Sequence, residues 1–165
     1  MSVAQFSKRS TSLPDSTTRV GVCSRSFSRN PVLKDALGQR FSHVTFNELN
    51  RSLVGDELVE FLKHKEAAIV ALEVIDSKLL EQLPELKVIG KYGVGLDKLD
   101  LYALEKNNIR LGWTPGVNAL SVAELTLNLS LSLVRKTFQA RDMVKVGAWQ
   151  QVVGRELSSL TIGIL

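Results

Sequence analysis

The feature that most constrains the fold is a repeated alternation between short apolar runs and segments of helical pattern. The runs have the length and β-branched or apolar composition of buried strands, and they cover residues 19–27, 43–46, 67–75, 88–92 and 109–113. A segment whose apolar residues follow helical spacing lies between successive runs. Strands that alternate with helices form parallel sheets covered by helices on both faces. The sequence therefore predicts an α/β fold.

Several residues mark where the intervening helices begin. Asn30 precedes Pro31, a pairing typical of an N-cap followed by the first helical position. Asp76 is the predicted N-cap of a later helix, and Asp97 that of the helix that follows the run at 88–92.

The segment 125–134 carries two conflicting signals. Apolar and polar residues alternate strictly, which is typical of a half-exposed strand. However, Ser121 and Glu124 have the spacing of a capping box, and no glycine or proline follows until Gly147. We therefore predict one long helix over about residues 119–144, apolar on nearly all sides and hence buried on several of them.

The N-terminal end holds the net charge of the chain. The formal charge is +4, and residues 1–30 contain five basic residues and one acidic residue, so 5 − 1 = +4. The excess is therefore not a basic face on the folded body, and we expect no nucleic-acid partner. Residues 1–18 are rich in Ser and Thr without an apolar signal segment, which predicts a disordered tail; an organellar transit peptide remains an alternative.

Two further observations bear on the compartment. No run of about 18 apolar residues occurs, so we expect no membrane association. The sole cysteine, Cys23, cannot form an intrachain disulfide, which is consistent with a reducing compartment and predicts a small buried side chain. We therefore expect a cytoplasmic protein.

The residues after the run at 88–92 can bind an anion. Gly93 and Gly95 flank Val94 directly after Tyr92, and glycines let successive N–H groups face a ligand at the carboxyl end of a strand. An ordinary turn between strand and helix explains the same glycines equally well. Asn118 has two readings as well, as a turn or cap residue or as a ligand contact.

Three stretches together resemble a known family. They are LKVIGKYGVGLDKLDL (86–101), TPGVNALSVAELTLNLSLSLVR (114–135), and GAW (147–149) followed by GRELSSLTIGIL (154–165). Over about residues 20–165 the chain resembles the D-isomer-specific 2-hydroxyacid dehydrogenases, and within them the phosphoglycerate dehydrogenase-like branch.

The resemblance implies a domain organisation. Residues 19–117 would form a flavodoxin-like substrate-binding domain that lacks its C-terminal return segment. Residues 118–165 would supply a linking helix and the first strand, 161–165, of a truncated Rossmann domain for NAD(P). In this family the helix that matches 119–144 makes dimer contacts, so the resemblance also implies a homodimer or pairing with a full-length homologue.

The resemblance also implies site residues. The loop that matches Tyr92, Gly93, Val94 and Gly95 would bind the carboxylate of a small 2-hydroxy or 2-oxo acid, and Asn118 would line the same cleft. Val94, together with Ser121 and Val122 at the start of the helix, would approach the cofactor, NAD or NADP.

Other parts of the family's machinery are absent from the sequence. No G-x-G-x-x-G occurs in the 165 residues, and the family's catalytic Arg, Glu and His would follow later in the chain. His43 and His64 are predicted to be surface residues, and no catalytic or metal-binding set is expected. The prediction is thus the N-terminal part of an NAD(P)-dependent oxidoreductase acting on a D-2-hydroxy acid such as 3-phosphoglycerate. As an isolated chain it would be inactive and would not bind the cofactor tightly; the alternative is a non-catalytic module that pairs with a full-length relative.

Overall fold

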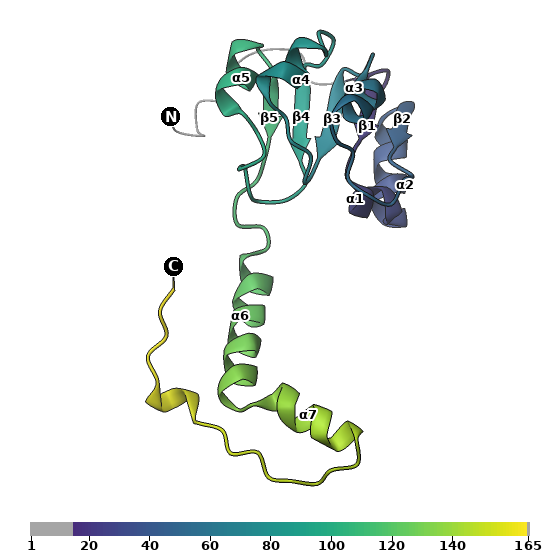
Figure 1. Cartoon of the computed structure of the whole chain (residues 1–165). Helices are drawn as coiled ribbons and strands as arrows, with labels where there is room; N and C mark the ends of the chain where they lie inside the picture. The colour runs from purple at the N-terminus through teal and green to yellow at the C-terminus, as the bar shows by residue number, and fades with distance from the viewer. Residues whose placement is uncertain (1–14, 165) are drawn as a thin grey trace. The chain divides into compact units, whose positions relative to one another are not determined.

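A five-stranded parallel sheet forms the centre of the first part of the chain (Figure 1). The computed structural model describes residues 15–164, and the chain divides into two compact units, residues 1–115 and 116–165. The strand order β2-β1-β3-β4-β5 is that of a flavodoxin-like sheet, which confirms the predicted fold class. The strands are β1 (Arg19–Val22), β2 (His43–Phe46), β3 (Ala67–Val70), β4 (Val88–Lys91) and β5 (Arg110–Gly112).

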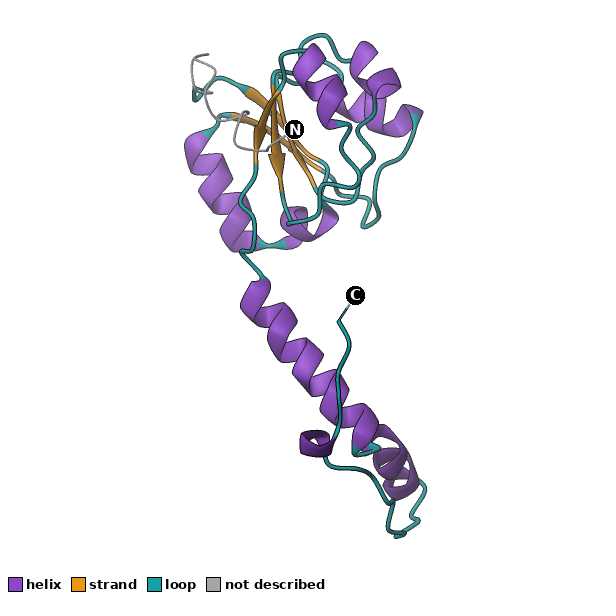
Figure 2. Ribbon diagram, turned by 90° about the vertical axis from the view of Figure 1, so that its left-hand side faces the viewer, coloured by secondary structure: helices purple, strands orange, loops and turns teal. Residues whose placement is uncertain are grey.

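Helices cover both faces of this sheet (Figure 2). One face packs against α1 and α2 through Val20, Val22 and Phe27, and the other packs against α3, α4 and α5 through a larger cluster that includes Ile89 and Leu104. Side chains of one strand alternate between the faces, as a sheet buried on both sides requires. The helices are α1 (Arg25–Arg29), α2 (Pro31–Arg40), α3 (Asp56–Leu62), α4 (Ser77–Glu81) and α5 (Leu101–Lys106).

Two of the predicted helix starts are confirmed. The side chain of Asn30 accepts a hydrogen bond from the N–H of Leu33, and Pro31 is the first residue of α2. The carboxylate of Asp76 accepts from the N–H of Leu79 and caps α4. Each cap satisfies an N–H group that has no partner inside its helix.

The predicted start of the next helix at Asp97 is wrong. Helix α5 begins at Leu101, and Asp100 caps it by accepting from the N–H of Ala103. The reason is tertiary: Ile75 bonds through its backbone to Lys98 and Asp100 on either side of Leu99. This bridge holds Leu99 in a β-bridge after the turn at residues 97–98, so the helix cannot begin earlier.

Two apolar runs are only partly strands. The run at 19–27 ends as a strand at Val22, because the Ser24 hydroxyl accepts from the N–H of Phe27 and starts α1. The run at 67–75 ends as a strand at Val70. The strands predicted over 19–27 and 67–75 were therefore too long at their carboxyl ends, where the chain leaves the sheet.

In the second unit the long helix predicted over 119–144 is two helices, α6 (Ala119–Val134) and α7 (Thr137–Lys145). The break falls at Lys136, which has a left-handed backbone with φ 54°. A continuous helix would use the carbonyl of Val134 to accept from Phe138. That carbonyl instead accepts from the N–H of Arg155, 2.8 Å away, so a later part of the chain takes the place of the next turn.

Small polar residues make the alternating segment compatible with a helix. The hydroxyl of Thr126 donates to the carbonyl of Val122, and that of Ser130 donates to the carbonyl of Thr126, each at 2.8 Å. These hydroxyls are thus satisfied by the preceding turn. The capping box predicted at Ser121 and Glu124 is wrong, because α6 already begins at Ala119.

Helix α6 is not buried on several sides, contrary to the prediction. Its only buried side chain is Ser132, while Leu120 is 73% and Leu133 72% exposed. The apolar residues surround the helix, and within this unit α7 and a 3-10 turn, η2 (Leu157–Ser159), contact only part of it.

The predicted strand at 161–165 is also not formed in the described residues, which end at Ile164. Thr161–Ile164 have no strand assignment. A β-strand requires a neighbouring strand for its backbone hydrogen bonds, and the described part of this unit contains none.

Of the tail predicted over 1–18, residues 1–14 lie outside the described residues, and Asp15 forms a turn with Thr17 and Thr18. None of the described helices is long and apolar enough to cross a membrane.

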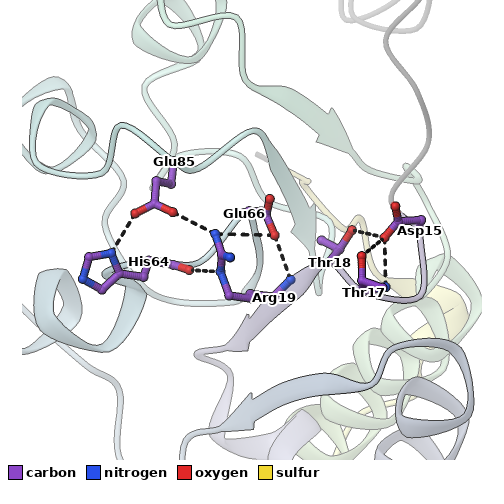
Figure 3. A network of polar contacts seen from close by, with 7 residues as sticks. All are labelled: Asp15, Thr17, Thr18, Arg19, His64, Glu66 and Glu85. Atoms are coloured by element: carbon purple, nitrogen blue, oxygen red, sulfur yellow. Dashed lines mark hydrogen bonds and ion pairs between the residues drawn. The ribbon is translucent and has the colours of Figure 1, made fainter.

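A network of polar side chains lies at the amino end of the sheet (Figure 3). Glu85 accepts from the Arg19 guanidinium at 2.8 Å and lies 2.7 Å from Nδ1 of His64. Arg19 also donates to the carbonyl of His64, and its backbone N–H donates to Glu66. The network thereby joins β1 to the segments before β3 and β4.

This network predicts a loss of stability in acid. The hydrogen bond from His64, assisted by Arg19, lowers the pKa of Glu85 below its ordinary 4.5. A carboxylate with a lowered pKa stabilises the folded state above its unfolded pKa, and this contribution is lost as the pH falls through the folded pKa. We therefore expect the melting temperature of Glu85→Gln to lie below that of the wild type at about pH 5.5 and to approach it at about pH 3.

The measurement is thermal unfolding followed by circular dichroism across that pH range. Glu60→Gln is the matched control, since Glu60 is 76% exposed and makes a single 3.4 Å contact with Lys63. A melting-temperature difference for Glu85→Gln that stays constant down to pH 3 would contradict the assignment.

Candidate anion-binding loop at the end of strand β4

The four residues Tyr92–Gly95 form the loop that leaves the carboxyl end of β4. Gly93 has φ 130°, a conformation that L side chains rarely adopt, and no neighbouring atom lies within 4 Å of the place a Cβ would occupy. The glycine at 93 is therefore required by the backbone conformation rather than by lack of space. Val94 is half-buried and Gly95 is exposed.

The backbone donors of this loop are available. Among the hydrogen bonds of the described residues, none uses the N–H of Gly93, Val94 or Gly95. Consecutive unpaired N–H groups at the end of a strand form a site that favours a carboxylate or a phosphate.

Trp113 fixes the other side of the loop. Its indole Nε1 donates to the carbonyl of Val94 at 3.0 Å, and it directly follows β5. The sequence analysis missed this residue. Local sequence carries no signal for it, because the contact forms only where the sheet places the carboxyl ends of β4 and β5 side by side.

Neighbouring strands anchor the start of the loop. The N–H of Tyr92 donates to the carbonyl of Val70 at 2.8 Å, and the ammonium of Lys91 donates to the carbonyl of Ala71. The ring of Tyr92 meets that of Phe27 edge to face, with centroids 5.3 Å apart. The loop thus departs from a fixed point on β3, β4 and α1.

The charges around the loop are mixed. Asp97 places a carboxylate oxygen 3.0 Å from where a Cβ on Gly95 would lie, while Lys91 and Lys98 provide the opposite charge nearby in the chain. Any anion selectivity therefore comes from the directed N–H groups more than from net charge.

Two buried groups lie at the same edge of the sheet without offering nucleophilic chemistry. Glu73 is 2% exposed, and its carboxylate accepts from the N–H of Ala71 at 2.7 Å. Burial, with a smaller effect from Glu73, raises the pKa of the Cys23 thiol. Cys23 is buried, as predicted. Its thiol stays protonated, and since the thiolate is the reactive form of cysteine, Cys23 offers no nucleophile.

The remaining predicted site residues belong to the second unit. Asn118 occupies the N-cap position of α6, but its side chain makes no capping hydrogen bond. Ser121 and Val122 lie in the first turns of that helix, both exposed. Tyr92–Gly95 belong to the first unit and these three residues to the second, so their common role remains a prediction.

Other polar groups of the described chain form no competing site. No cluster of His, Cys, Asp and Glu side chains within residues 15–164 has a geometry suitable for a metal ion. His43 and His64 are both exposed, as predicted. A hollow of about 650 Å³ lies at the amino end of the sheet, between residues such as Thr17 and Lys65, and Tyr92–Gly95 do not line it.

Known proteins resemble this chain in sequence. A glyoxylate reductase of Thermofilum pendens is 33% identical over 117 residues, which are 67% of this chain and 34% of the relative. A D-3-phosphoglycerate dehydrogenase of Methanocaldococcus jannaschii is 32% identical over 139 residues, 82% of this chain and 26% of the relative. The chain thus spans about a quarter to a third of the length of these two relatives.

Solved structures and the family model agree with these relatives. The D-lactate dehydrogenase of Aquifex aeolicus, solved with NAD and lactic acid, superposes with a TM-score of 0.71 at 25% identity, covering 87% of this chain and 42% of that one. The catalytic-domain model of the D-isomer specific 2-hydroxyacid dehydrogenases matches residues 24–159. Taken with the flavodoxin-like sheet and the glycine loop after β4, this match shows that the chain belongs to the D-isomer specific 2-hydroxyacid dehydrogenase family.

Proposed function

We propose that this chain is the substrate-binding part of an NAD(P)-dependent oxidoreductase that interconverts a D-2-hydroxy acid and its 2-oxo acid. The observation that carries the proposal is the loop Tyr92–Gly95, whose three consecutive N–H groups are unpaired at the carboxyl end of β4. The family match supports the reaction class, and relatives named for glyoxylate, 3-phosphoglycerate and lactate support a small carboxylic acid as substrate.

In this proposal the loop orients the acid. Hydrogen bonds from Gly93, Val94 and Gly95 to the carboxylate would hold C2 at a fixed position, which reduces the entropy that must be lost before reaction. Bound NAD or NADP supplies or accepts the hydride at C2. Val94, Ser121 and Val122 are the residues of this chain that we propose to face the cofactor.

We further propose that the 165 residues alone do not catalyse turnover. They contain no glycine-rich G-x-G-x-x-G turn for the pyrophosphate. Both histidines are exposed, and His64 lies at the amino end of the sheet in the Glu85 network. Neither is placed to exchange a proton with an acid bound at the opposite edge.

The test is a titration of the ¹⁵N-labelled chain with oxamate, an analogue of a 2-oxo acid, followed by amide shifts. We expect saturable shifts at Gly93, Val94 and Gly95, and none with oxamide, in which an uncharged amide of nearly the same shape replaces the carboxylate. A parallel assay of NADH oxidation with glyoxylate is expected to show no turnover. Shifts that are equal for both compounds would refute carboxylate binding, and turnover would refute the inactivity of the isolated chain.

A second candidate function rests on the exposure of α6. Leu120, Leu127 and Leu133 are each more than half exposed, and apolar surface of this kind is typical of an interface. The chain would then be a non-catalytic module that pairs through α6 with a second copy or a full-length relative. Self-association in light scattering, together with no oxamate binding, would favour this candidate over the first.

A further inference from the structure

We infer that Trp113 is a positioning residue that orients the loop Gly93–Gly95 for an anion. The inference rests on the proposed carboxylate-binding function of that loop and adds the group that sets its geometry. The indole N–H donates to the carbonyl of Val94 at 3.0 Å.

The direction of this bond determines the direction of a neighbouring donor. The peptide bond between Val94 and Gly95 is trans, and in a trans peptide the C=O and the following N–H point in opposite directions. Because the Val94 carbonyl points to Trp113, the N–H of Gly95 points away from the indole. The hydrogen bond from Trp113 to the Val94 carbonyl thereby orients the N–H of Gly95 toward the opposite side of the loop.

The loop needs such a restraint because its own sequence does not provide one. Gly93 and Gly95 have few backbone restrictions, and no neighbouring atom lies within 4 Å of the position that a Cβ on Gly93 would take. The anchors before the loop, at Lys91 and Tyr92, fix only its start. Trp113 is the partner that restrains the peptide after Val94.

The position of Trp113 is itself well defined. It follows β5, which pairs in parallel register with β4 so that Gly112 lies opposite Gly90. The donor therefore stands on a strand end that the sheet holds in place, and a rigid support is what a preorganised site requires.

The experiment removes the indole N–H while keeping the ring. In a Trp149→Phe background, Trp113 becomes the only tryptophan, since the chain has two and Trp149 is 94% exposed. Biosynthetic replacement of Trp113 by benzothienylalanine then exchanges its N–H for sulfur at nearly constant shape. Trp113→Phe is the second variant, and the Trp149→Phe chain is the matched control.

Two measurements apply to each chain: the oxamate affinity from amide shifts, and the ¹⁵N heteronuclear NOE of Gly93–Gly95 without ligand. We expect benzothienylalanine to weaken oxamate binding about three- to tenfold, the loss of one neutral hydrogen bond, and to lower the NOE of the loop but not of β4. In the control, the Trp113 indole resonance should shift upon saturation with oxamate.

The outcomes separate the two proposals. If the control binds oxamate and the benzothienylalanine chain binds it equally well with an equally ordered loop, the positioning role is overturned and carboxylate binding stands. If the control does not bind oxamate, the proposed function fails, and the inferred orientation for an anion fails with it. A loss of affinity in Trp113→Phe that benzothienylalanine does not reproduce would assign the effect to ring packing and overturn the role of the N–H.

Discussion

Replacing Leu104 with alanine is expected to lower the free energy of unfolding of the first unit by about 2–5 kcal/mol. Leu104 is fully buried in α5 and belongs to the cluster that includes Leu58 and Ile89. The cost has two parts, the lost transfer of the side chain from water and the cavity left behind, which a close-packed interior fills only partly.

The backbone of Leu104 is held in place, which supports a large loss in the free energy of unfolding. Its N–H donates to the carbonyl of Asp100, and its carbonyl accepts from Ile109 at the turn into β5. The backbone around the cavity is therefore restrained at both ends.

Urea denaturation followed by circular dichroism measures the loss of unfolding free energy in Leu104→Ala. Leu72→Ala is the control, because Leu72 is 63% exposed and surface substitutions change stability by about 0.5 kcal/mol or less. Equal losses for the two variants would contradict the core described for this unit.

Gly93→Ala is expected to weaken oxamate binding about tenfold or more, at a conformational cost of about 1–3 kcal/mol. Gly93 has φ 130°, and nothing lies within 4 Å of the position of an added Cβ. The effect therefore comes from backbone strain and not from a clash. An alanine would shift the loop toward another conformation, in which the three N–H groups no longer keep their present orientation.

The control for this prediction is Gly38→Ala. Gly38 lies inside α2 and also has no atom within 4 Å of the added Cβ, so alanine there should stabilise the chain by about 0.5–1 kcal/mol and leave oxamate binding unchanged. The amide-shift titration and urea denaturation measure both quantities. If Gly93→Ala binds oxamate as the wild type does, the loop geometry is not what binds the acid.

The candidate site was predictable only in part. The glycines at 93 and 95 are visible in the sequence because a turn at the carboxyl end of a strand needs them. Trp113 was not, because it is 19 positions from Val94 and acts only through the register of β4 and β5. The anchoring of Lys91 on the carbonyl of Ala71 likewise depends on which strands are neighbours.

The start of α5 and the end of α6 show the same limit in the fold. Asp97 and Asp100 are equivalent as local caps, and the bridge of Ile75 to residues 98–100 selects the second. The helix after Ala119 contains no local breaker at 135–136, and the hydrogen bond from Arg155 to Val134 ends it.

The sequence by itself determined the alternation of strands and helices, the caps at Asn30 and Asp76, and the glycine loop after β4. These features depend on residues close together in the chain, where side-chain pattern and backbone preference act directly. Only the tertiary structure decided the start of α5, the break at Lys136, the exposure of α6 and the hydrogen bond of Trp113 to Val94. Each of these depends on whether a distant backbone group or strand is available as a partner, and local propensity carries no information about that.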